Sequence, residues 1–173
     1  MEKFAAVLSL VGSLAMVPAA AAGAPGPASF DGSCSLTGVL RFEPGLGAAM
    51  ATTTAIARAS GECSGVLTKS NGETVTLNDE SATYRGRASG EQSCAAGTTR
   101  GVSRLRIAGQ TVRFTLSETR VGVLAVIRLR DATGATTTGL AAVAPSEESI
   151  NQAMACSSTA GLTRVPVTIS TTS

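Results

Sequence analysis

The sequence predicts an all-β protein, an antiparallel β-sandwich of about ten short strands with one short helix near the C-terminus. Alternation of apolar and polar residues with a period of two recurs along the chain, which is typical of half-buried strands. Turn pairs that contain glycine or asparagine separate these segments. A closed up-and-down β-barrel is the alternative, because it buries one face of each strand in the same way.

Residues 1–22 are predicted to be a cleavable secretory signal peptide. A short charged start, Met1 to Lys3, precedes an apolar run from Phe4 to Val17, and Pro18 ends that run before a stretch of small residues. These are the three parts that a signal peptidase recognises. The run is shorter than the ~20 residues that cross a bilayer. We therefore expect a secreted, extracellular protein with no membrane span after cleavage, and cell-wall association as one form of that location.

The rest of the chain is predicted to be one domain. Residues 23–29 are Gly, Ala, Pro and Ser, which is the composition of a flexible linker. Residues 30–173 then form a single disulfide-stapled all-β domain, whose length is close to that of an ordinary single domain.

In the first half of the domain the alternation predicts strands at 35–42, 50–58, 66–70, 73–77 and 81–89. Glu43-Pro44-Gly45 ends the first of these as a turn. Asn71-Gly72 lies between the third and fourth and is the strongest hairpin signal, because both residue types tolerate positive φ.

In the second half, strands are predicted at 102–107, 110–116, 121–129, 136–143 and 162–170. The first two flank Ala108-Gly109 and would point their apolar residues inward: Leu105, Ile107, Val112, Phe114 and Leu116. Residues 121–129 alternate poorly, which favours a central strand buried on both faces. The helix is predicted at 145–154, with Ser146 as its N-cap.

Four cysteines in an exported chain predict two disulfides rather than a metal site, because no C-x-x-C pair is present. In a strict up-and-down meander Cys34 and Cys63 lie at one end of the strands, and Cys94 and Cys156 lie at the other. Disulfides need Cα atoms within about 7 Å. The pairing Cys34–Cys63 with Cys94–Cys156 therefore follows, and we expect no metal and no cofactor.

The cysteine layout also resembles that of a known group. Cys34-Ser-Leu-Thr-Gly38, Phe42-Glu-Pro-Gly45-Leu46 and the positions of Cys94 and Cys156 resemble those of uncharacterised small secreted four-cysteine β-domain proteins of high-GC Gram-positive bacteria. The similarity covers most of the chain after the signal. Members of the group often carry a Trp in the middle strands, and this chain has none. The resemblance implies export and a fold, without an activity.

The composition excludes several kinds of chemistry. The chain has no His, so Ser-His and Cys-His nucleophiles are excluded, and we predict that the protein is not an enzyme. Carboxylates are the remaining candidates for acid–base work: the adjacent pairs Asp79-Glu80 and Glu147-Glu148, and the isolated Glu43, Glu62, Glu91 and Glu118. Adjacent acids of this kind are usually solvated or cap a helix. Aromatic residues make up 3% of the chain. This scarcity disfavours base stacking, so we expect no nucleic-acid partner.

Arginines gather in the middle of the chain, and the predicted hairpin places Arg104 opposite Arg113, with Arg106 on the same outer face. Such a basic patch would fit an anionic cell-envelope polymer or an acidic protein. The alternative is an ordinary solvated face, balanced by acids of neighbouring strands: Glu73, Glu91 or Asp131.

Four function classes follow from the sequence. The leading hypothesis is a secreted, non-enzymatic binding or structural domain, associated with the envelope through its basic face. The second is a carrier of a small apolar ligand, which needs a barrel with an unfilled interior. The third is a secreted inhibitor that presents the disulfide-braced loop at 91–99. The last of them is an enzyme that uses carboxylates, which two acids facing each other across a cleft would favour. A closed barrel with an apolar cavity would favour the carrier, and an exposed, rigid loop at Cys94 would favour the inhibitor.

Overall fold

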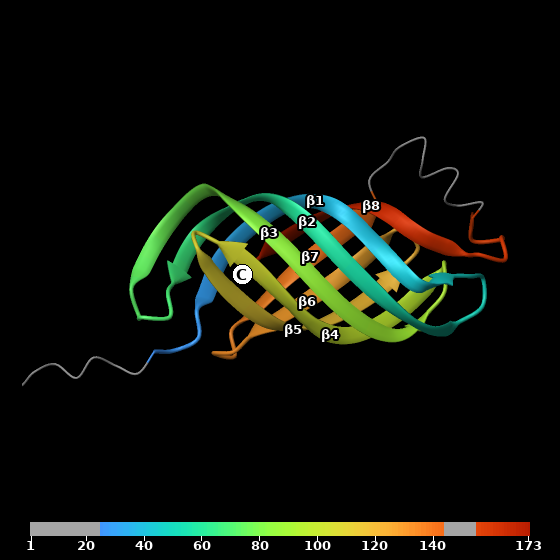
Figure 1. Cartoon of the computed structure of the whole chain (residues 1–173), viewed down its shortest axis with the longest axis horizontal. Coiled ribbons are helices and arrows are strands. Elements are labelled where there is room, and N and C mark those ends of the chain that lie inside the picture. The colour runs from blue at the N-terminus through green and yellow to red at the C-terminus, as the bar shows by residue number, and fades with distance from the viewer. Residues whose placement is uncertain (1–24, 144–154) are drawn as a thin grey trace, which may run out of the picture.

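The computed structural model describes residues 25–143 and 155–173, which form a closed barrel of antiparallel strands in sequence order (Figure 1). The strands are β1 (Ser29–Leu46), β2 (Ala51–Thr68), β3 (Thr74–Gln92), β4 (Ala96–Ile107), β5 (Gln110–Val121), β6 (Leu124–Asp131), β7 (Thr136–Val143) and β8 (Leu162–Thr172). β8 pairs with β1 and closes the barrel, so the sandwich prediction is wrong and the barrel alternative is confirmed.

Two predicted strand breaks, at 59–65 and 78–80, lie inside the long strands β2 and β3, whose ladder has a single irregularity there. The register of the β2–β3 ladder shifts between Cys63 and Gly65, beside Asp79, which has a φ of 50°. The Ser64 hydroxyl accepts a hydrogen bond from the Asp79 N–H at 2.8 Å and donates one to Asp79 Oδ1 at 2.9 Å. This local pairing lets β2 and β3 continue through segments that look like turns, so the described residues form eight strands rather than ten.

The predicted single strand at 121–129 is wrong, because the structure divides this range between the end of β5, a turn and β6. Gly122 has a φ of 59° and forms a turn between β5 and β6. β6 alternates strictly between exposed and buried residues, and it is not buried on both faces. The poor alternation of the sequence arises because apolar Leu124 and Val126 point outward.

The two predicted hairpin turns are confirmed. Gly72 has a φ of 85° in the turn between β2 and β3. Ala108 and Gly109, with φ of 45° and 75°, join β4 to β5, which matches the positive φ that two-residue hairpins require.

Three sequence predictions concern the chain outside the strands. The predicted signal peptide and the helix at 145–154 lie outside the described residues. The described part of the predicted linker packs on the barrel, since Ala28 is buried and the Gly26 N–H donates to the Ser70 carbonyl at 2.9 Å. Within the described ranges, no helix is long and apolar enough to cross a membrane.

Side chains fill one half of the barrel interior. This half lies toward the β2–β3, β4–β5 and β6–β7 turns, and the first of these turns is at the left in Figure 1. Its inward positions carry branched and aromatic residues, as the alternation predicts: Phe30, Leu36, Leu67, Leu77, Leu105, Ile107, Val112, Phe114 and Leu129.

Both predicted disulfides are confirmed. Cys34 and Cys63 lie directly opposite each other in β1 and β2, with Cα atoms 4.1 Å apart. Cys94, in the β3–β4 loop, joins Cys156, with Cα atoms 6.0 Å apart. Two disulfides indicate folding in an oxidising environment.

Candidate functional site

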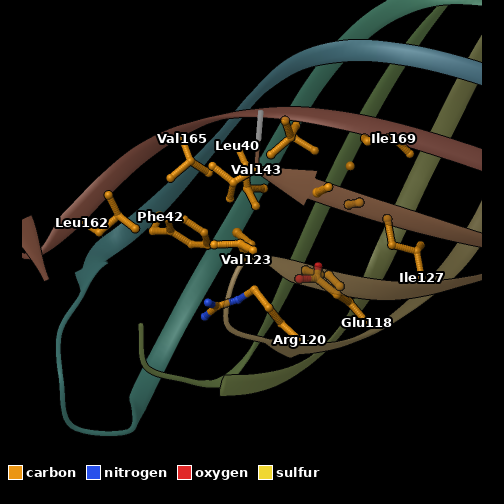
Figure 2. A pocket seen from close by; sticks show the side chains of 18 of the residues that line it. Leu40, Phe42, Glu118, Arg120, Val123, Ile127, Val143, Leu162, Val165 and Ile169 are labelled. Carbon is orange, nitrogen blue, oxygen red and sulfur yellow. The ribbon is translucent and has the colours of Figure 1, made fainter. Parts of the chain in front are cut away.

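The other half of the barrel is hollow. At this end the inward positions of several strands carry Ala or Gly, which leave space that larger side chains would fill: Ala55, Ala57, Gly86, Ala88, Ala125 and Ala141. The result is a cavity of about 410 Å³. Larger apolar residues complete its walls, as Figure 2 shows: Leu40, Phe42, Ile127, Val143, Leu162, Val165 and Ile169.

Tyr84 separates the hollow half from the packed half. Its side chain is 5% exposed and lines both the cavity and a void of about 20 Å³ in the packed half. A Cβ atom at Gly86 would lie 3.0 Å from the Tyr84 hydroxyl oxygen, so the glycine makes room for the ring. Burial raises the pKa of the Tyr84 hydroxyl, which keeps it neutral. The cavity therefore has an uncharged floor.

The rim of the cavity is partly apolar and exposed. Val123, in the β5–β6 turn, lines the cavity and is 64% exposed. Val121 and Leu124, which flank the same turn, are also exposed. Apolar surface is therefore continuous from the outside of the barrel into its interior.

Arg120 reaches into this end of the barrel from β5 and holds the loops around the mouth. Its guanidinium donates to the carbonyls of Cys94 at 3.1 Å and Gly122 at 3.4 Å, and also to the carbonyl of Ser93. It also lies over the Phe42 ring, 5.8 Å from the centroid. Burial lowers the pKa of Arg120, but an arginine remains charged at neutral pH. The guanidinium thus donates its hydrogen bonds mainly to backbone carbonyls of the β3–β4 loop and the β5–β6 turn.

Glu118 lies two residues earlier on β5 and points into the cavity beside Arg120 (Figure 2). It is the one acidic residue among the described residues that line the cavity. The ion pair Lys69–Glu73 is the only one within 4 Å in the described ranges, so no described cation lies that close to Glu118. Burial raises the pKa of the Glu118 carboxyl, and nearby Arg120 opposes this only in part. The cavity thus holds one carboxyl that gains a proton more readily than an exposed one.

This raised pKa predicts a pH-dependent stability. A carboxyl whose pKa is higher in the folded state stabilises the fold below its unfolded pKa, and this contribution is lost as pH rises through the folded pKa. Glu118→Gln keeps the shape and cannot ionise. We expect its melting temperature to exceed that of the wild type at pH 8 and the two to converge near pH 4, as thermal unfolding across this range would measure.

The control is Glu62→Gln, because Glu62 is exposed on β2 and does not line the cavity. It should follow the wild-type profile at every pH. If Glu118→Gln unfolds at the lower temperature at pH 8, the ionised carboxylate is stabilising and the raised pKa is refuted.

The predicted basic patch lies on the outer surface, away from the cavity. Arg104 and Arg113 are directly opposite each other, and Arg106 is exposed on the same face. The acids that were predicted to balance these arginines do not pair with them. Glu73 pairs with Lys69, Glu91 accepts a hydrogen bond from Thr52, and Asp131 is buried.

Sequence reasoning missed the role of Glu118 and Arg120 in the cavity. In the sequence Arg120 belongs to the basic run, and Glu118 to the isolated acids. The signal that could have found them is the period of two, because the inward series Val112, Phe114, Leu116 continues to both residues.

The loop at 91–99 does not project from the barrel. Gln92 and Ser93 are buried, and Cys94 is partly buried in the cavity wall. The Cys94 N–H donates to the Gly47 carbonyl at 2.8 Å, which ties the loop to the β1–β2 connection. This arrangement favours the cavity over the loop as the candidate site. Among the described residues, no group of His, Cys, Asp or Glu could hold a metal ion.

No protein-family model, curated protein or solved structure matches this chain. The resemblance to secreted four-cysteine proteins therefore stays a prediction, and the site is interpreted from its own geometry.

Proposed function

We propose that this protein is a carrier that binds a small, mostly apolar molecule inside the barrel. The observation that carries the proposal is the cavity of about 410 Å³, with apolar walls and one ionisable carboxyl. Pockets for small molecules commonly measure about 300–1,000 Å³ and combine apolar walls with a few polar groups. Each Å² of apolar ligand surface removed from water contributes about 25 cal/mol.

The carboxyl of Glu118 indicates the chemistry of the ligand. When protonated it can donate a hydrogen bond, and when ionised it accepts hydrogen bonds or pairs with a cation. Arg120 is largely occupied by backbone carbonyls, so Glu118 is the better-placed polar partner. We therefore expect an apolar body with one hydroxyl, amide or amine group directed at Glu118.

The loops around the mouth are fixed by contacts within the protein itself. Three carbonyls are fixed by Arg120, and the Cys94–Cys156 disulfide anchors the β3–β4 loop. A preformed site avoids much of the ordering cost of binding. This supports reversible carriage rather than folding around the ligand.

The test is binding of N-phenyl-1-naphthylamine, an apolar fluorophore with one N–H donor, to the purified oxidised protein. Ala88→Phe and Ala141→Phe each place a ring in the cavity, from β3 and β7. We expect each to weaken binding at least tenfold, because the ring occupies the volume the probe needs. Fluorescence titration measures the change.

The matched control is Leu140→Phe, which adds a ring on the outer face of β7, since Leu140 is exposed. It should bind the probe as the wild type does. Equal affinity in all four proteins, with circular dichroism showing that all are folded, would overturn the proposal. Saturable binding that only the two cavity variants lose would support it.

A further inference from the structure

Arginines form a continuous row across the outer face of the barrel. Arg58 in β2 lies directly opposite Arg85 in β3. Arg85 lies opposite Arg104 in β4, which in turn lies opposite Arg113 in β5. All four side chains are exposed. Directly opposite residues in antiparallel strands have Cβ atoms about 5 Å apart, so four positive charges follow one another around the barrel.

A second, parallel row lies one step along the same strands. Ile56, Arg87, Val102, Thr115 and Arg130 are successive cross-strand partners from β2 to β6. Both rows line one surface groove of about 570 Å³. The groove thus has six arginines around a floor that includes apolar Val102.

Described acidic residues do not neutralise this groove. Its one acidic lining residue, Asp131, is buried, and its Oδ1 accepts hydrogen bonds from the Thr133 and Ala135 N–H groups within its own turn. The sole ion pair in the described ranges joins Lys69 and Glu73, outside the groove. Like charges directly opposite each other destabilise a sheet. An external anion would relieve this repulsion.

We propose that this arginine groove binds a linear, phosphate-bearing polyanion. A guanidinium presents a planar fork of N–H donors that matches phosphate oxygens in pairs. A chain of regularly spaced phosphates can follow the row from strand to strand and meet every arginine. A flat anionic membrane would touch the convex barrel along a narrow strip and reach fewer of them.

A nucleic acid fits the groove less well than a polymer without bases. Binding of single strands relies on aromatic side chains that stack on the bases. The one aromatic residue of the lining, Phe114, faces the interior and is buried. The groove is also separate from the ligand cavity, since the arginines point outward, so each proposal can fail without the other.

The test is binding of fluorescently labelled linear inorganic polyphosphate, measured by anisotropy at several salt concentrations. Arg85→Gln/Arg104→Gln removes two opposite arginines from the groove. We expect affinity to fall at least tenfold. The slope of log affinity against log salt concentration should become smaller in magnitude by about two, because two phosphates are no longer neutralised.

The matched control is Arg41→Gln/Arg164→Gln, which removes another directly opposite exposed pair, from β1 and β8, outside the groove. Its affinity should fall less than about twofold, because only distant charge is removed. An equal fall in the two double variants would show attraction by net charge alone and overturn the site.

Two further measurements separate the sources of phosphate. Tighter binding to single-stranded DNA of equal phosphate number, or to anionic lipid vesicles, would overturn the assignment in favour of those partners.

The groove variant should melt at the same or a higher temperature than the wild type, since it relieves repulsion. A lower melting temperature would mean that its weaker binding reflects damage to the fold.

Discussion

The double variant Cys94→Ala/Cys156→Ala is expected to lose about 4 kcal/mol of stability, because the bridge closes a long loop. The two cysteines are 62 residues apart in the sequence, and the bond between them restricts the unfolded chain. The same bond anchors the β3–β4 loop at the mouth of the cavity, where Arg120 also holds the carbonyls of Ser93 and Cys94. We therefore expect weaker binding of the naphthylamine probe together with the loss of stability.

The other disulfide provides the control. Cys34 and Cys63 are 29 residues apart, and their bond closes a loop worth about 3–4 kcal/mol in the same treatment. They lie toward the packed half, so Cys34→Ala/Cys63→Ala should lose similar stability while probe affinity changes less than about twofold. Urea denaturation and fluorescence titration measure the two effects. A loss below about 1 kcal/mol for the Cys94 and Cys156 pair would contradict the loop-closure explanation.

The disulfide pairing could be predicted although the number of strands could not. The pairing depends only on strand direction, and the structure removes two predicted reversals, one before Val66 and one before Ser81, because β2 and β3 continue through a single irregularity of their ladder. Removing two reversals leaves the direction of every later strand unchanged. Cys94 and Cys156 therefore remain at the end that the meander assigned to them.

The choice between barrel and sandwich had no local signal. Both folds require the same inward alternation in each strand, and it was predicted correctly for Leu105, Val112 and Phe114. What decides the fold is the pairing of β1 with β8, between residues more than a hundred positions apart, such as Ser33 and Thr172. Neither β1 nor β8 contains a residue that indicates this pairing.

The cavity could not be predicted from the sequence because it is the space that small inward side chains leave empty. In β2 the inward residues are Ala55, Ala57 and Ala59, whereas the larger Ile56 lies on the outer face. A search for apolar bulk therefore favours the outer face of this strand.

The arginine row was recognised in part, at Arg104 and Arg113, because a two-residue turn sets that register. Arg85 joins the row only through the β3–β4 pairing, and Arg58 only through the long β2–β3 pairing.

Tyr84→Ala is expected to lose about 3–5 kcal/mol, the usual cost of removing a buried aromatic ring. The value should lie in the upper part of this range, because the closed ladder of strands resists collapse into the space left behind. The ring lines both the cavity and the small void beneath it, so its loss joins them into one deeper cavity. Chemical denaturation measures the stability.

Tyr84→Phe separates the ring from its hydroxyl. This variant keeps the floor of the cavity and should lose only about 1 kcal/mol. If the ring divides the interior as inferred, a longer apolar probe such as 1,6-diphenylhexatriene should bind more tightly to Tyr84→Ala than to Tyr84→Phe. Equal binding of that probe to both variants, each confirmed as folded at the assay temperature, would show that the packed half closes over the space. The depth of the cavity would then depend on Leu116, Ile127 and Ile169 rather than on Tyr84.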